Sequence, residues 1–172
     1  MKSEKFLKLA LGLIFTWYFL SSALRPEQWH FIDNVDLIIH EAGHWIFIIF
    51  GQFMSVLGGS LTQIAIPFIF VLYFYFKKDI YSASILAMWC GYNIVNVAYY
   101  LSDSVYMRLP LLGGESSIHD WNYILSSLNL LNRTSAIASV VNAIGIFVII
   151  VGAVLAVKFY KTEFRPEPVD FN

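Results

Sequence analysis

The chain has 172 residues, of which 58% are hydrophobic and only 13% are charged, and its formal net charge is -1. Soluble domains carry roughly 25% charged residues, and a domain this small has too much surface to cover with about half that share. The composition excludes a soluble enzyme and a disordered chain, the single cysteine excludes a disulfide scaffold, and the charge balance excludes a nucleic-acid partner. It indicates one integral membrane domain, residues 1–172, surrounded by the lipid bilayer.

Apolar stretches predict an all-α, polytopic bundle of five to six transmembrane helices, because about 20 residues cross about 30 Å of hydrocarbon. The predicted spans are, in chain order, Leu9–Leu24, Val35–Leu57, Leu61–Phe76, Ile80–Leu101, Ile118–Leu131 and Ser135–Tyr160. The stretch 118–131 has fourteen residues, so it is a tilted, partial or re-entrant segment protected by its neighbours.

The ends of the chain leave two alternatives open. Lysines before the first apolar stretch, with Ser21, Ser22 and Ala23 after it, also resemble a secretory signal peptide, but its aromatic cluster favours a retained helix. With six crossings, seven of the eleven Lys and Arg residues lie on the side of both termini. The positive-inside rule then predicts that both termini are cytoplasmic, as in a bacterial inner membrane protein. With five crossings the rule indicates no orientation.

The second predicted span contains the motif His40-Glu41-Ala42-Gly43-His44. Helix positions four apart lie on one face, so the two imidazoles can bind one zinc ion while the intervening Glu41 acts as the general base. An ionisable side chain at membrane depth costs about 2.5–3.5 kcal/mol on insertion scales. Metal coordination compensates for this cost, and the alternative is a hydrogen-bonded polar cluster that joins helices.

A third zinc ligand is expected, because a catalytic zinc usually has three protein ligands. The candidates are His119 and Asp120, at the start of the short apolar stretch. If Ser117 and Asp120 form a capping box, His119 is the ligand. Otherwise Asp120 binds the metal, and His119 orients the site or stabilises an oxyanion. Asp103 and Glu115 are the remaining candidates.

Other polar or small residues lie in apolar surroundings. Hydrogen bonds between helices, worth about 0.6 kcal/mol on average, are the simpler interpretation of Gln63, Asn93 and Asn96. The alternative is that Asn93 and Asn96 bind an unwound substrate backbone near the metal. Gly43 favours close approach of another helix, and the Gly58-Gly59 pair predicts a turn.

The chain resembles the site-2 protease type of intramembrane zinc metalloprotease, which has HExxH early in a transmembrane helix and a later third ligand. It is similar to small bacterial membrane proteins of that group over residues 36–131. The matching features are the HEAGH motif, Gly58, Gly59, Gln63, Pro67 and the His-Asp-Trp run at 119–121. The resemblance implies a zinc metallopeptidase that acts on membrane or membrane-proximal proteins and peptides, and it leaves the oligomeric state open.

The residues also leave three other functions to consider. A degenerate homologue that binds metal and retains membrane client proteins without cleaving them is the main alternative. A di-iron oxidase would require several histidine clusters, and the chain has only four histidines. A transporter would use intramembrane carboxylates but leaves the histidine spacing unexplained.

The predicted topology raises a geometric problem for the zinc site. If the second, third and fourth spans all cross, His119 returns to the membrane from the side opposite the start of the second span. Either His40 and His44 lie near the middle of the membrane, or one segment is re-entrant. The short stretch Leu61–Phe76, which contains Pro67, is expected to be the partial span.

Overall fold

The computed structural model describes residues 2–110, 112 and 119–161, and every regular element in these ranges is a helix. The prediction of an all-α chain is confirmed. The elements are α1 (Lys2–Ala23), α2 (Asp33–Phe47), the 3-10 helix η1 (Ile48–Phe50), α3 (Gln52–Phe76), α4 (Ile80–Ser102), α5 (Asp120–Ser127), the 3-10 helix η3 (Leu131–Arg133) and α6 (Thr134–Phe159).

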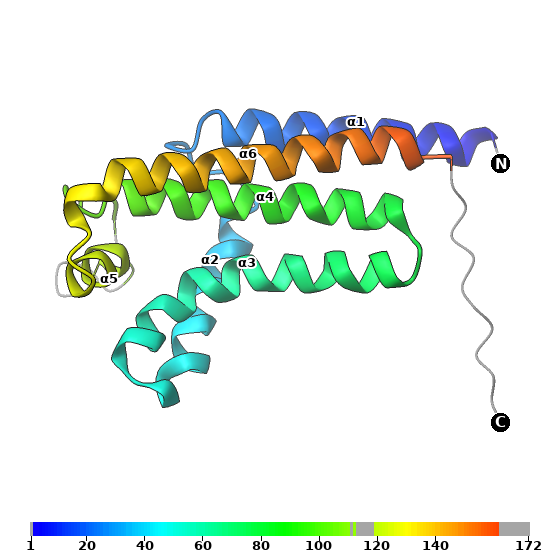
Figure 1. Ribbon diagram of the computed structural model, residues 1–172. Coiled ribbons are helices and arrows are strands. Elements are labelled where there is room, and N and C mark those ends of the chain that lie inside the picture. Colours follow the sequence, from blue (N-terminus) through cyan, green and yellow to red (C-terminus); the bar gives the residue numbers. More distant parts are fainter. Residues whose placement is uncertain (1, 111, 113–118, 162–172) are drawn as a thin grey trace, which may run out of the picture.

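Helix α4 is the centre of the bundle, where it packs against α1, α3 and α6. These helices run alongside one another, while α2 and the first part of α3 form a hairpin that projects away from them (Figure 1). Helix α5 lies at the end of the bundle where α4 ends and α6 begins (Figure 1). The short helix α2 precedes the long α3 in the chain and α5 follows it, and both pack against α3.

The core lies between α1, α4 and α6. Phe19, Met88, Tyr92 and Ile149 are among its buried side chains. Helices α4 and α6 cross closely because Gly91 of α4 and Gly145 of α6, which face each other, have no side chains. A Cβ on Gly91 would lie 2.8 Å from the carbonyl oxygen of Gly145. Such contacts between small residues are typical of helices packed in a membrane.

Three segments of the described chain are long and apolar enough to cross a membrane: Ser3–Ala23, Gln52–Phe76 and Leu131–Phe159. Large apolar side chains cover their outer faces; Trp17 and Phe147, for example, are 70% and 66% exposed. This surface is compatible with lipid contact. Helix α4 is not among the three, since its polar residues lower its hydropathy. Five to six crossings stay a prediction.

The boundary between the second and third helices differs from the predicted one. Helix α2 ends at Phe47, and the chain turns at Gly51, whose φ of 90° is readily adopted only by glycine. The predicted turn at Gly58-Gly59 is wrong, because both residues lie inside α3. The stretch 61–76 is the second part of a helix of 25 residues, and a partial crossing by it stays a prediction.

Glycines instead bring α2 and α3 together. A Cβ on Gly43 would overlap the carbonyl oxygen of Gly58 and lie 2.7 Å from Thr62 Oγ1, and a Cβ on Gly58 would lie 2.7 Å from the carbonyl oxygen of Gly43. The expectation that Gly43 permits close approach of another helix is consistent with this packing.

We expect the substitution Gly43→Ala to destabilise the protein by about 1–3 kcal/mol, the usual cost of overpacking. Alanine is the better helix former by about 1 kcal/mol, so a loss of stability reports the steric conflict alone. Gly12→Ala is the control, because its new Cβ would lie 3.7 Å from its nearest neighbours. Thermal unfolding in detergent measures both, and a Gly43→Ala protein as stable as Gly12→Ala would contradict the packing.

Candidate metal centre

The inner face of α2 carries the two histidines of the motif. His40 and His44 are one helical turn apart, and their ring centroids are 4.8 Å from each other. On the opposite face, Ile38 and Trp45 are 72% and 75% exposed. Helical periodicity alone therefore places both imidazoles toward the protein and the large apolar side chains toward the outside.

Asp120 of α5 completes a group of three potential ligands. Its Oδ2 atom lies 2.9 Å from Nε2 of His40 and 3.3 Å from Nε2 of His44. The three ligand atoms all lie within 4.8 Å of one another. Two imidazole nitrogens and one carboxylate oxygen form a donor set found in catalytic zinc sites, so this group could hold a metal ion.

The outer nitrogens of both histidines have partners of their own, while the inner nitrogens face Asp120. Nδ1 of His44 lies 2.9 Å from the carbonyl oxygen of Ser55, and Nδ1 of His40 lies 3.0 Å from Oε1 of Gln63. Because an oxygen acceptor requires a proton on Nδ1, the lone pair of each ring is left on Nε2. Metal-binding histidines are usually held in this way.

The negative charge of Asp120 favours a positive charge between the carboxylate and the two histidines. Burial alone would raise the pKa of Asp120, but hydrogen bonds to His40 and His44 hold it below its usual range. An ionised carboxylate thus faces two imidazole nitrogens. Protons on Nε2 or a divalent cation satisfy this arrangement, and binding of the cation would release those protons.

Gly59 forms the wall of this group on α3. A Cβ at this position would lie 2.5 Å from Nε2 of His40 and 2.7 Å from Cε1 of His44. Space for the inner nitrogens therefore depends on the absence of a side chain. A residue that sequence alone presents as a turn former is part of the site.

Helix α5 is held in place by contacts to α3 and α4. The backbone N–H of Asp120 donates to the hydroxyl of Tyr100 (3.2 Å), and the indole N–H of Trp121 donates to Oγ of Ser60 (3.2 Å). These two bonds fix the start of α5, and with it the carboxylate of Asp120, against the rest of the bundle.

His119 does not belong to the metal group. Its Nδ1 atom caps α5 by accepting from the backbone N–H of Asn122 (3.3 Å), and its Nε2 lies 3.5 Å from Oδ2 of Asp103. Its ring packs on Tyr100 with the centroids 4.5 Å apart. Burial lowers the pKa of His119, and the carboxylate of Asp103 only partly opposes this shift. Because Nδ1 accepts, the proton of a neutral ring lies on Nε2, which faces Asp103 without forming a hydrogen bond to the described residues.

The capping-box interpretation is therefore wrong. Helix α5 begins at Asp120 with His119 as its N-cap, so Asp120 is not at the third helical position, and Ser117 lies outside the described residues. Oδ2 of Asp103 accepts the backbone N–H groups of residues 108 and 109, which makes Asp103 a loop-capping residue. Glu115 lies outside the described part of the chain.

The two asparagines lie between helices. Asn93 is fully buried and donates to the carbonyl of Trp89, whereas Asn96 accepts from Nε2 of Gln63 (3.0 Å). Their role in binding a substrate backbone stays a prediction. The interhelical contact of Gln63 and Asn96 agrees with the simpler interpretation of these residues.

Glu41 lies beside the metal group without joining it. Its carboxylate accepts no hydrogen bond from the residues that the structure describes, and it is near enough to His44 and Tyr100 for its charge to act on both. The side chain of His44 is 23% exposed, against 10% for those of His40 and Asp120. The group thus opens on the side of His44.

Three contributors to the site were not anticipated in these roles: Ser55, Gly59 and Tyr100. No local pattern could reveal the carbonyl of Ser55, since any residue there supplies one. Tyr100 and Gly59 become significant only through contacts with distant helices.

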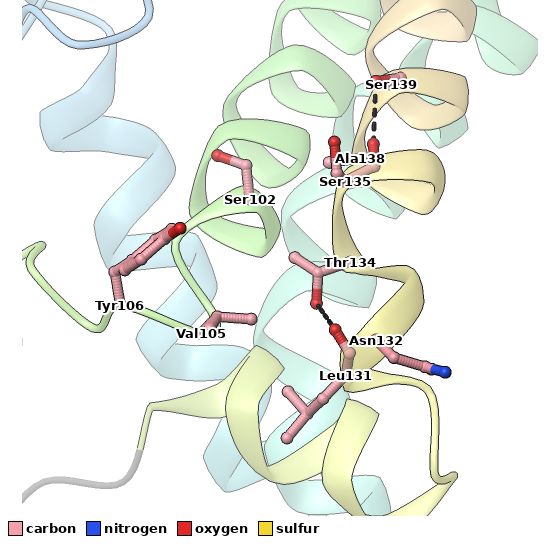
Figure 2. Close-up of a pocket in the computed structure, with 9 residues that line it drawn as sticks. All are labelled: Ser102, Val105, Tyr106, Leu131, Asn132, Thr134, Ser135, Ala138 and Ser139. Carbon is pink, nitrogen blue, oxygen red and sulfur yellow. Dashed lines mark hydrogen bonds between the residues drawn. The ribbon is translucent and has the colours of Figure 1, made fainter.

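A groove elsewhere on the molecule is separate from this group. It lies where α4 ends and α6 begins and is lined largely by hydroxyl side chains (Figure 2). The hydroxyls of Thr134 and Ser139 donate hydrogen bonds to the backbone carbonyls of Leu131 and Ser135, respectively (Figure 2). None of the lining residues belongs to the metal group.

The described residues thus contain one group, His40, His44 and Asp120, that could hold a metal ion, with a free carboxylate beside it. The contact between His40 and Asp120 joins residues 80 positions apart in the sequence. No protein-family model, curated protein or solved structure matches this chain.

Proposed function

We propose that this protein is a membrane-embedded zinc metallopeptidase. The observation that carries the proposal is the convergence of two Nε2 atoms and one carboxylate oxygen on one point, with the Nδ1 atoms occupied by oxygen acceptors. Glu41 between the two histidines adds the base that peptide hydrolysis requires. The resemblance to site-2 proteases in the HExxH motif points to the same chemistry.

His40, His44 and Asp120 would hold the zinc ion. When bound, zinc supplies Lewis acidity that polarises a peptide carbonyl and makes water acidic near neutral pH. Glu41 takes the proton from the attacking water and passes it to the leaving amine. Its carboxylate, which has no hydrogen-bond partner among the described residues, and the opening at His44 leave room for this transfer.

The substrate class follows from the surroundings of the group. The outer face of α2 is apolar, as the exposure of Ile38 and Trp45 shows, and three helices have the length and hydropathy of membrane spans. We therefore propose that the substrate is a membrane-embedded or membrane-proximal peptide segment, and that the protein resides in a bacterial inner membrane.

The test is metal content together with peptide cleavage by the full chain purified in detergent. We expect about one zinc per chain for the wild type, and loss of both zinc and cleavage in His44→Ala and Asp120→Ala. His30→Ala is the matched control, because Nε2 of His30 contacts the carbonyl of Arg25 (3.1 Å), not the metal group.

Each result of this experiment is informative. A wild-type chain without metal would overturn the proposal. Zinc retained by Asp120→Ala would remove Asp120 from the ligand set. Stoichiometric zinc without cleavage of any membrane peptide would favour the alternative, a metal-bearing protein that binds membrane clients without hydrolysing them.

A further inference from the structure

A continuous line of hydrogen bonds, buried at His40 and partly buried beyond it, leads away from the metal group. Nδ1 of His40 lies 3.0 Å from Oε1 of Gln63, and Nε2 of Gln63 donates to Oδ1 of Asn96 (3.0 Å). Nδ2 of Asn96 in turn donates to Oδ1 of Asp33 (3.4 Å). Three consecutive side-chain bonds thus connect His40 with a carboxylate at the start of the same helix.

These hydrogen bonds form a circuit, which starts and ends on α2 and passes through α3 and α4. It starts on α2 at His40, passes through Gln63 of α3 and Asn96 of α4, and returns to α2 at Asp33. Asp33 is 4% exposed and Gln63 is 3% exposed. Water therefore has little access to Asp33 and Gln63, while Asn96 is half-buried, so the amide of Gln63 must find its partners within the circuit.

Asp33 sets the direction of every bond in the circuit. Its carboxylate can only accept, and it also accepts the hydroxyl of Tyr92 (2.7 Å) and the backbone N–H of His30 (2.6 Å). Asn96 must therefore turn its NH₂ group toward Asp33, which leaves its oxygen for Gln63.

The same rule reaches the metal group. Since the oxygen of Asn96 requires a donor, Gln63 turns its NH₂ group to Asn96 and its oxygen to His40. His40 thereby keeps a proton on Nδ1, and its Nε2, which faces Asp120, is left for a metal ion or for a second proton. Reversing the amides would place the oxygen of Asn96 against the carboxylate of Asp33, which is unfavourable.

We propose that Asp33 is a positioning residue for the metal site, which acts through Asn96 and Gln63 to hold His40 in its metal-binding tautomer. The inference rests on the proposed metal site and adds a residue that touches neither metal nor substrate. Outer-shell partners of this kind typically contribute about 10–100-fold to metal affinity.

The experiment compares metal affinity in three variants of the full chain. Asp33→Asn can donate as well as accept, so the direction of the circuit is released, and we expect Zn²⁺ and Co²⁺ to bind about 10–100-fold more weakly. Asp36→Asn is the matched control: Asp36 is also buried on α2 and accepts from the indole of Trp89 on α4 (2.8 Å), outside the circuit. It should retain wild-type affinity.

A second change separates this role from a structural one. In the double variant Asp33→Asn with Gln63→Glu, a carboxylate next to His40 accepts its Nδ1 proton directly, and the reversed Asn96 is still satisfied. We expect this variant to recover most of the lost affinity. The readouts are chelator competition and the Co²⁺ absorption spectrum, which reports the ligand geometry apart from cleavage.

Failure of the two proposals can be told apart. A wild-type chain that binds no metal would overturn both of them. Metal binding by the wild type together with unchanged affinity in Asp33→Asn would overturn only the role of Asp33. Equal losses in Asp33→Asn and Asp36→Asn, or no recovery in the double variant, would likewise show that the circuit does not set the tautomer of His40.

Discussion

Replacing Glu41 by glutamine is expected to reduce peptide cleavage by about 10²–10⁴-fold, the usual contribution of a general base. The amide has nearly the same shape as the carboxylate but cannot take a proton from water. Zinc content should not change, since Glu41 is not a member of the metal group and accepts no hydrogen bond from the described residues. Cleavage of transmembrane peptides in liposomes, followed by mass spectrometry, measures the effect.

Glu27→Gln is the control for this substitution, because Glu27 is exposed in the loop before α2. It should cleave as fast as the wild type. A Glu41→Gln protein with full activity would exclude Glu41 as the base. Loss of zinc in the same protein would instead show that Glu41 supports the metal directly.

Gly59→Ala is expected to abolish metal binding at concentrations that saturate the wild type. The added methyl would lie 2.5 Å from Nε2 of His40 and 2.7 Å from Cε1 of His44. Neither ring can turn away cheaply, because its Nδ1 is tied to Gln63 or Ser55. Displacing both ligand atoms should cost more than the roughly 10–100-fold of an outer-shell change.

The measurement for Gly59→Ala is zinc affinity by chelator competition, with thermal unfolding recorded on the same samples. Gly12→Ala should match the wild type in both, since its new Cβ makes ordinary contacts at 3.7 Å. A Gly59→Ala protein that binds zinc normally would show that the ion does not lie between these two rings.

The long helices and the short helices have different roles in this protein. The long helices α1, α3, α4 and α6 form the bundle, while the ligands come from α2, with 15 residues, and α5, with 8 residues. Because neither short helix has the length to cross a membrane, the metal group can form without placing its two halves on opposite sides. Such an arrangement would avoid the geometric problem raised by the predicted spans, and the set of segments that cross stays a prediction.

The sequence by itself determined the features that depend on local periodicity. Few charges and long apolar runs predicted an all-helical chain with membrane-length segments, because burial of backbone polar groups in lipid demands helices. The four-residue spacing of His40 and His44 placed both rings on one face, since this relation depends only on 3.6 residues per turn.

Only the tertiary structure decided which distant residues meet. Asp120, rather than His119, reaches the two histidines because α5 begins two residues later than a capping box would place it. Gly58 and Gly59 lie within a helix because α2 packs against them, although their local preference is for a turn. The circuit from Asp33 to His40 crosses three helices. Contacts between residues far apart in the chain have no local pattern, so packing alone determines them.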